Sequence, residues 1–352
     1  MADQEGGRLL THTIKDVAKL AGVAPSTVSR VIADSPKISA KTKARVKAVM
    51  AELGYHPNVH ARNLVNKQTN VIGVIMPSVS YAPFQNPFFP EVLRGITAQA
   101  NEDKYGLYLS TGQLESDIIE EVKEMVHSRR VDGMILLYST TADPVIPFLL
   151  EENFPFVVIG RPPEQLEGVV SYVNNDNVKA AKMLTEYLLL LKHQRIGFIG
   201  GRKDAYVTLD HREGYCEALT SAGLEINEGD LVYHDEVFEG GEQAVIELMA
   251  QVTPPTAIIV ADDLMALGVL RMLSSMGYQV PKDISVVSFN NVLMSELASP
   301  PLTTMDIQIY ELGFKSAELL RKRIANPDLP MQAVKVGHRL VRRETSQAIE
   351  RQ

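Results

Sequence analysis

The sequence predicts an α/β protein with an N-terminal helix-turn-helix head and a larger two-lobed core with parallel sheets. Three observations predict this fold class. Residues 13–32 contain two short helix patterns on either side of a glycine. From residue 71 onward, short apolar runs alternate with helical stretches, as they do in parallel sheets covered on both faces. The charge is divided unevenly, since residues 1–67 hold 11 Lys/Arg and 5 Asp/Glu, whereas the remainder holds 24 and 38.

The first helix of the head has one buried face. Its stripe of apolar or small residues consists of Ile14, Val17, Ala18 and Ala21. These positions follow the i, i+3, i+4, i+7 spacing of a helix buried on one side. Gly22 stands where a helix usually ends on a residue with positive φ. Pro25 is expected in the first turn of a second helix, because the N–H that proline lacks would have no helical partner there.

The second and third helices complete a small core. The inner face of the second helix consists of Val28, Val31 and Ile32. A third helix is predicted over residues 39–54, with Ser39 as its N-cap and Gly54 just beyond its last turn. Its buried stripe consists of Val46, Val49, Met50 and Leu53.

The outer face of the second helix carries residues that can contact DNA bases: Ser26, Thr27, Ser29 and Arg30. Arg30 can form a bidentate pair with guanine, and hydroxyls can pair with several base edges. In this motif the second helix lies in the major groove. Phosphate contacts, which position a protein without reading sequence, are predicted for Thr13, Lys37, Ser39 and Thr42. A solvated helical pair is the alternative, and the basic charge of the head argues against it.

The head resembles the DNA-binding domain of the lactose-repressor (LacI/GalR) family of bacterial regulators. The runs that carry the resemblance are TIKDVAKLAGV, STVSRVI and ELGYHPN. One position departs from the pattern, because the family commonly has Ser where this chain has Ala24. The loss of a hydroxyl N-cap costs about 0.5–2 kcal/mol.

Residues 58–64, NVHARNL, resemble the hinge of the same family. The resemblance implies a short helix that contacts the minor groove through Asn58, Ala61 and Leu64. It also implies that Leu64 wedges between base pairs and kinks the operator. Such a wedge costs a few kcal/mol of unstacking, which the contacts allowed by the bend offset. A plain linker is the alternative, because so short a segment does not hold a helix alone in water.

The composition is that of an ordinary globular protein, with 45% hydrophobic and 22% charged residues. No apolar run reaches the ~18 residues of a transmembrane helix, and the N-terminus lacks the apolar core of a secretory signal. Residues 1–12 are expected to be a disordered lead segment. The lone Cys216 excludes an intramolecular disulfide and suits a reducing compartment. We therefore expect a cytoplasmic, nucleoid-associated protein.

Seven apolar runs of the core are predicted strands: 71–76, 106–111, 133–138, 156–160, 195–200, 256–261 and 284–289. The helices predicted between them include 90–103, 118–129, 178–191 and 264–276. These strand–helix units are too many for one small sheet. We therefore expect two lobes, each with its own sheet. With the head over 13–57 and the hinge and linker over 58–70, the predicted N-lobe spans about 71–168 and 294–325. The predicted C-lobe spans about 169–293 and 326–346.

A dinucleotide-dependent enzyme is the main catalytic alternative. The chain has no G-x-G-x-x-G after a strand, since FIGGRKD at 198–204 lacks the spacing. It also lacks a G-K-[ST] phosphate loop and a G-x-S-x-G elbow. Its eight His and one Cys show no metal-ligand spacing. We therefore expect neither catalysis nor a cofactor or metal.

Ligands of open α/β sheets bind beyond the carboxyl ends of the strands. The aromatic and polar residues near those ends are the candidate effector contacts: Tyr81, Phe88, Phe89, Arg161, Asp176, Arg212, Phe238, Asp262 and Asn290. Aromatic faces beside Asp, Asn and Arg suit a sugar, and a site built to bond hydroxyls rejects ligands that lack them. The two Phe residues could instead be interlobe core. Asp176 and Asp262 could instead be helix N-caps.

The core resembles the periplasmic-binding-protein-like domain of the same family, whose two lobes close on a small ligand. The resemblance implies effector contacts at Phe88, Phe89, Arg212, Phe238, Asp262 and Asn290. The family usually has Asp where Asn290 stands, and Asn carries no charge. The runs YAPFQNPFFPEVLRGI, RRVDGMILLYS and FPFVVIGR are similar to the maltose-operon repressors of Gram-positive bacteria. This similarity implies maltose or a maltodextrin as effector.

Together these features predict a homodimeric, sequence-specific DNA-binding repressor of sugar-utilisation genes, in which each operator half-site faces one recognition helix. A sugar between the lobes would act through its different affinities for two states of the protein. A carbon-catabolite regulator with a phosphoprotein co-repressor is one alternative. A sugar-binding transport protein is another, which the basic head and the missing secretory signal disfavour.

Overall fold

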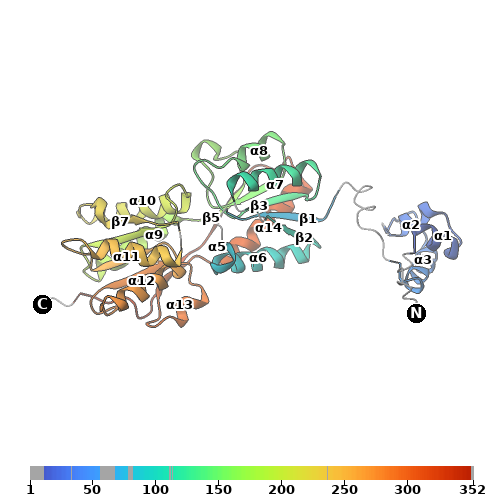
Figure 1. Ribbon diagram of the computed structural model, residues 1–352. Coiled ribbons are helices and arrows are strands. Elements are labelled where there is room, and N and C mark those ends of the chain that lie inside the picture. Colours follow the sequence, from blue (N-terminus) through green and yellow to red (C-terminus); the bar gives the residue numbers. More distant parts are fainter. Residues whose placement is uncertain are drawn as a thin grey trace, which may run out of the picture. The chain divides into compact units, whose positions relative to one another are not determined.

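The computed structural model describes residues 12–32, 34–55, 68–77, 82–110, 112, 114–235 and 237–349. The chain divides into two compact units, Met1–Thr69 and Asn70–Gln352. Figure 1 shows the small helical unit in blue and the larger α/β unit in the colours that follow. The predicted fold class is confirmed, because a helix-turn-helix head precedes two sheets of mostly parallel strands.

The head contains the helices α1 (Ile14–Ala21), α2 (Pro25–Ile32) and α3 (Ala40–Glu52). Among its described residues, the fully buried apolar side chains are Val17, Ala18, Ala21, Val28, Val31 and Val46. Gly22 ends α1 with φ = 62°, and the Val23 N–H donates to the Ala18 carbonyl at 3.0 Å. Glycine adopts this left-handed conformation without strain, so the chain can turn sharply into α2.

Ala24 lies at the N-cap of α2, where its carbonyl accepts from the N–H groups of Thr27 and Val28 at 2.8 and 3.2 Å. We predict that Ala24→Ser stabilises α2 by about 0.5–2 kcal/mol, because a hydroxyl can accept a further N–H of the first turn. Hydrogen exchange at the amides of residues 26 and 27 should slow accordingly. Ala44→Ser, at an exposed position inside α3, is the control. Equal protection in both variants would contradict the capping effect.

The first sheet of the core forms the N-lobe. Its strand order is β11 (Ala333–Val336), β5 (Tyr172–Asn175), β4 (Phe156–Ile159), β3 (Gly133–Leu136), β1 (Val71–Ile75) and β2 (Gly106–Leu109). Each neighbouring pair is parallel. One face packs against α6 (Phe88–Glu102) and α14 (Ile309–Ala325), and the other against α7 (Glu115–His127) and α8 (Val145–Glu151). Burial on both faces explains why the central strands β1, β3 and β4 are continuously apolar.

The second sheet forms the C-lobe. Its strand order is β12 (Arg339–Val341), β10 (Thr303–Asp306), β9 (Ser285–Phe289), β8 (Ala257–Val260), β6 (Ile196–Gly200) and β7 (Leu231–Tyr233). Only the β10–β12 pair is antiparallel among these described strands. One face packs against α9 (Asn177–Leu190) and α10 (Tyr206–Ser221), and the other against α11 (Phe238–Met249) and α12 (Asp263–Ser275). The short helices of the core are α5 (Ala82–Gln85) and α13 (Leu293–Leu297).

The chain crosses between the lobes from β5 to α9, from β10 to α14 and from β11 to β12. The sequence predicts these crossings earlier, near residues 168, 293 and 325. The structure differs because β5 pairs with β4, β10 with β9, and β11 with β5, which places each of these strands in the lobe opposite to the predicted one. Each predicted boundary therefore falls within one lobe, and the boundary near residue 293 falls at the start of α13.

Asn175 links the three crossovers. Its buried side-chain amide lies 3.0, 3.1 and 3.2 Å from the carbonyl oxygens of Ile307, Val336 and Gly337. Ile307 belongs to the second crossover, and Val336 and Gly337 to the third. A single buried amide therefore holds together the segments about which the lobes would rotate.

Replacement of Asn175 should destabilise the core. Asn175→Ala is expected to lower the free energy of unfolding by about 1–3 kcal/mol, because buried carbonyls lose their donor. Asn175→Asp should cost more at neutral pH, since a carboxylate would face those oxygens. The folded pKa of that carboxyl would be raised, so stability should fall as the pH rises above the ordinary Asp value of about 4. Urea unfolding at pH 4 and pH 7 measures both effects. Equal losses for the two variants at both pH values would contradict this account.

None of the described helices has the length and apolar character needed to cross a membrane. The described residues likewise contain no group of three His, Cys, Asp or Glu side chains that could hold a metal ion.

Candidate functional site

The predicted base-contacting residues lie on the outer side of α2. Ser26, Ser29 and Arg30 are exposed, and Thr27 is half-buried. The opposite side of the same helix is buried through Val28 and Val31. The free surface of α2 thus offers hydroxyls and one guanidinium, which are groups that can read base edges.

Two of the predicted phosphate contacts occupy helix N-termini. Thr13 precedes α1, and its N–H and hydroxyl both donate to the Asp16 carboxylate at 2.8 Å, which lowers the pKa of Asp16. Ser39 caps α3 and accepts the Thr42 N–H at 3.3 Å. The positive end of a helix dipole attracts phosphate, so both positions suit the predicted contacts.

The lysines of the head differ in their freedom to meet phosphates. Lys37 is exposed. The Lys43 ammonium instead donates to the Asp34 carboxylate at 2.7 Å and to the Asp34 carbonyl at 3.0 Å. Four other predicted contacts lie outside the described residues, namely Asn58, Ala61 and Leu64 of the hinge and Tyr81 of the core.

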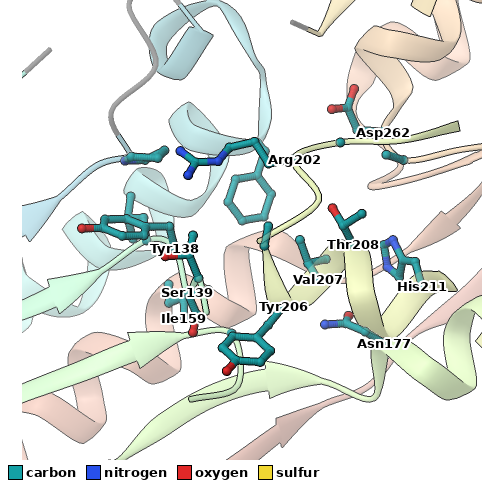
Figure 2. Close-up of a pocket in the computed structure, with 18 of the residues that line it drawn as sticks. Tyr138, Ser139, Ile159, Asn177, Arg202, Tyr206, Val207, Thr208, His211 and Asp262 are labelled. Carbon is teal, nitrogen blue, oxygen red and sulfur yellow. The ribbon is translucent and has the colours of Figure 1, made fainter. Parts of the chain in front are cut away.

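A pocket of about 290 Å³ lies between the two lobes, where the strands of both sheets end. Figure 2 shows side chains from both lobes around it. The N-lobe contributes residues from the ends of β1, β3, β4 and β5, and the C-lobe contributes residues from the ends of β6, β8 and β9 and from α10. Ligands of open α/β sheets bind beyond the carboxyl ends of the strands, which is where this pocket lies.

Four of the predicted effector contacts line this pocket: Phe88, Phe89, Asp262 and Asn290. The two phenylalanine rings pack edge to face, with centroids 5.2 Å apart. Asn290 follows β9 with φ = 108°, a strained conformation for a residue that has a Cβ. Strain of this kind gathers at functional sites, where the surrounding structure holds it in place.

Asp262 both caps a helix and lines the pocket. One carboxylate oxygen accepts the Met265 N–H of α12 at 2.8 Å. The other accepts from the Asn86 side chain of the N-lobe at 3.4 Å. Burial raises the pKa of Asp262, while hydrogen bonds from α12 and Asn86 act against that rise. The two interpretations of this residue, cap and ligand contact, are therefore compatible.

The other four described candidates do not line the pocket. Arg161 donates through Nε to the Asp210 carboxylate at 2.6 Å. Asp176 caps α9 by accepting the Lys179 N–H at 3.3 Å, and it pairs with Lys335. Phe238 begins α11 and lies under the Arg271 guanidinium, 4.6 Å from its ring centroid.

Arg212 lies on the outer side of α10, near Glu228 at 3.7 Å. Its neighbour His211 lines the pocket instead. Successive residues of a helix point about 100° apart, so the two side chains cannot share one direction. The register is set by Gly214, where a Cβ would lie 2.0 Å from the Val178 carbonyl, so α10 packs tightly on α9 and turns His211 inward.

The sequence reasoning missed several residues that line the pocket: Tyr138, Ser139, Arg202, Thr208 and His211. Tyr138 and Ser139 could have been found, because they lie at and just after the end of the predicted strand 133–138. The sequence indicates Thr208 and His211 less clearly. They are three residues apart on a helix that follows a strand, so they lie on the same face of that helix. His211 is buried and stacks on Phe289, with ring centroids 3.8 Å apart. Burial lowers its pKa to about 3, so the ring is neutral at physiological pH.

Comparison with known proteins identifies both units. The model of bacterial regulatory proteins of the lacI family matches residues 13–58, and that of a periplasmic binding protein-like domain matches residues 185–346. The HTH-type transcriptional regulator MalR of Streptococcus pneumoniae is 41% identical over 312 residues, which cover 88% of this chain and 91% of the relative.

Two solved structures extend the similarity. A complex of the transcriptional regulator CelR with cellobiose has a TM-score of 0.76 and 32% identity, covering 95% of this chain and 100% of that one. A probable maltose operon transcriptional repressor from Staphylococcus aureus has a TM-score of 0.72 and 28% identity, covering 80% and 99%. With this head, this core and these relatives, the chain belongs to the lacI family of bacterial regulatory proteins and is a DNA-binding transcriptional repressor.

Proposed function

We propose that this repressor controls sugar-utilisation genes and that its effector is maltose or a short maltodextrin. The interlobe pocket carries the proposal, because it combines aromatic faces with uncharged hydrogen-bonding groups. The rings come from Phe88, Phe89, Tyr138 and Tyr206, and the amides and hydroxyls from Asn86, Asn174, Asn177, Ser139 and Thr208. A sugar has apolar ring faces and hydroxyl edges, so it can use both sets of groups.

The charges around the pocket favour a neutral sugar over a sugar phosphate. The Arg202 guanidinium is paired with Asp204 at 2.7 Å. His211 is neutral, and Asp262 would repel an anion. A phosphate would therefore be desolvated here without a surplus of positive charge among the described lining residues.

Maltose is singled out by the resemblance of residues 81–96, 129–139 and 154–161 to maltose-operon repressors. Isothermal calorimetry of the full chain with maltose, maltotriose, sucrose, ribose and glucose-6-phosphate tests the proposal, with and without operator DNA. We expect heat with maltose or maltotriose and none with glucose-6-phosphate. Absence of heat with both maltodextrins would remove the maltose assignment.

We also propose that the protein is a homodimer, since paired heads are needed to read a two-fold operator. An exposed apolar surface on α13 supports a contact between copies. Leu293 and Leu297, one helical turn apart, are 71% and 72% exposed. Sedimentation of Leu293→Glu/Leu297→Glu should show a shift toward monomer, whereas the same change at exposed Leu190 should not. Unchanged dimerisation would exclude this surface.

The hinge completes the proposed mode of DNA binding, with Asn58, Ala61 and Leu64 in the minor groove. Operator bending by the full chain, measured by gel phasing, should decrease in Leu64→Ala because the apolar wedge is removed. An unchanged bend angle would contradict the wedge.

A further inference from the structure

Two loops join the lobes at one side of the pocket. The segment after β3 and the segment before α10 form an antiparallel bridge between Thr140 and Ala205. The Tyr206 N–H donates to the Ser139 carbonyl at 3.1 Å, and the Thr141 N–H donates to the Asp204 carbonyl at 3.0 Å. This backbone contact belongs to none of the three crossovers, so a rotation of the lobes could break it.

An ion pair lies beside this bridge. Arg161 follows β4 of the N-lobe, and Asp210 lies on α10 of the C-lobe. Their Nε–Oδ1 distance is 2.6 Å, and the two side chains are only 20% and 4% exposed. The Ser139 hydroxyl donates to the Arg161 carbonyl at 2.6 Å, which anchors the arginine to the same loop that forms the bridge.

The same arginine supports a wall of the pocket. Its guanidinium lies over the Tyr206 ring, 4.3 Å from the centroid. Tyr206 lines the pocket and is visible at its edge in Figure 2. One cation of the N-lobe thus holds both a buried carboxylate and an aromatic ring of the C-lobe.

The buried position of Asp210 makes the pair sensitive to loss of one partner. Burial raises the pKa of Asp210, and Arg161 counteracts this rise. An intact pair contributes little net stability, but removal of one member leaves an uncompensated buried charge. Separation of the lobes would return that charge to water, so a single substitution should favour the open arrangement.

We propose that Arg161 and Asp210 form an interlobe clasp that favours the closed pocket and positions Tyr206. Effector affinity is then set by lobe closure as well as by direct contact. The effect on effector affinity rests on the proposed sugar effector, whereas the interlobe clasp can be tested without any ligand.

The C-lobe provides a matched control pair. Arg195 and Asp230 lie 3.0 Å apart, with side chains 28% and 6% exposed, close to the exposure of the clasp. Both residues belong to one lobe, beside β6 and β7. Disruption of this pair should lower stability without a bias toward the open arrangement.

The test measures an interlobe distance by electron spin resonance in the ligand-free full chain. Labels are placed at Glu120→Cys of the N-lobe and Glu225→Cys of the C-lobe, both exposed, in a Cys216→Ser background. Arg161→Met and Asp210→Asn should shift the distance distribution away from that of the unsubstituted chain, and Arg195→Met should not. Arg161→Met/Asp210→Leu, which leaves no buried charge unpaired, should shift the distribution less than either single substitution. Unchanged distributions in both clasp variants, or an equal shift in the control, would overturn the clasp.

Calorimetry with maltose then tests whether effector affinity depends on the clasp. If the closed fraction falls to about one tenth, the apparent Kd rises about tenfold in the clasp variants. Affinity within about twofold of the unsubstituted chain is expected for Arg195→Met. Equal affinity in all variants would overturn the coupling of affinity to the clasp. Absence of binding by the unsubstituted chain would instead overturn the maltose proposal, and the distance measurement would still decide the clasp.

Discussion

Arg30→Ala is expected to weaken binding to the operator far more than binding to random DNA. Arg30 is exposed on α2, the helix that the motif places in the major groove. A bidentate contact with guanine contributes about 1–3 kcal/mol of discrimination, or roughly 5- to 150-fold in affinity. Fluorescence anisotropy with operator and scrambled duplexes, at fixed salt, measures the ratio.

Lys37→Ala is the matched control for that experiment. Lys37 is exposed in the loop before α3, where a phosphate contact is predicted. Its loss should weaken binding to both duplexes similarly and reduce the salt dependence by about one counterion. If Arg30→Ala also weakens both duplexes equally, Arg30 is a phosphate contact and does not read a base.

Asp262→Ala is expected to weaken effector binding by about 10- to 100-fold, because a hydrogen bond to a charged group is worth about 1.5–3 kcal/mol. The same change removes the cap of α12 and the partner of Asn86. The free energy of unfolding should therefore fall by about 0.5–2 kcal/mol. Calorimetry and urea unfolding of the same samples separate the two effects.

Asp262→Asn distinguishes capping from ligand binding. Asn is as good an N-cap as Asp, so the stability should be close to that of the unsubstituted chain. Effector affinity should still fall, since a neutral acceptor forms weaker hydrogen bonds than a carboxylate. If neither variant changes affinity while Asp262→Ala lowers stability, then Asp262 acts only as a cap.

The head was predictable almost to the residue because its signals are local. The apolar spacing of α1, the glycine after it and the proline that opens α2 each act within one helical turn. Seven strands of the core were predictable for a similar reason, as short apolar runs: β1, β2, β3, β4, β6, β8 and β9. The order of those strands was not predictable, because each strand pairs with a segment far away in the chain. The sequence of a strand does not determine which segment that is.

The lobe boundaries show the consequence. The strands β5, β10 and β11 lie in the lobe opposite to the predicted one, since their pairing decides their membership. The ligand pocket shows the same limit. Asp176 and Asp262 both precede a helix and cap it, but only Asp262 lines the pocket.

The sequence alone determined the fold class, the helix-turn-helix with its exposed reading face, and the edge of the sheets where a ligand would bind. These features depend on periodicity, on caps and on the carboxyl-end rule, which are properties of short segments. Only the tertiary structure decided that His211 and not Arg212 faces the pocket, and that Arg161 joins the lobes through Asp210. Those outcomes depend on how α10 packs on α9 and how the two lobes meet, which are contacts between residues far apart in the chain.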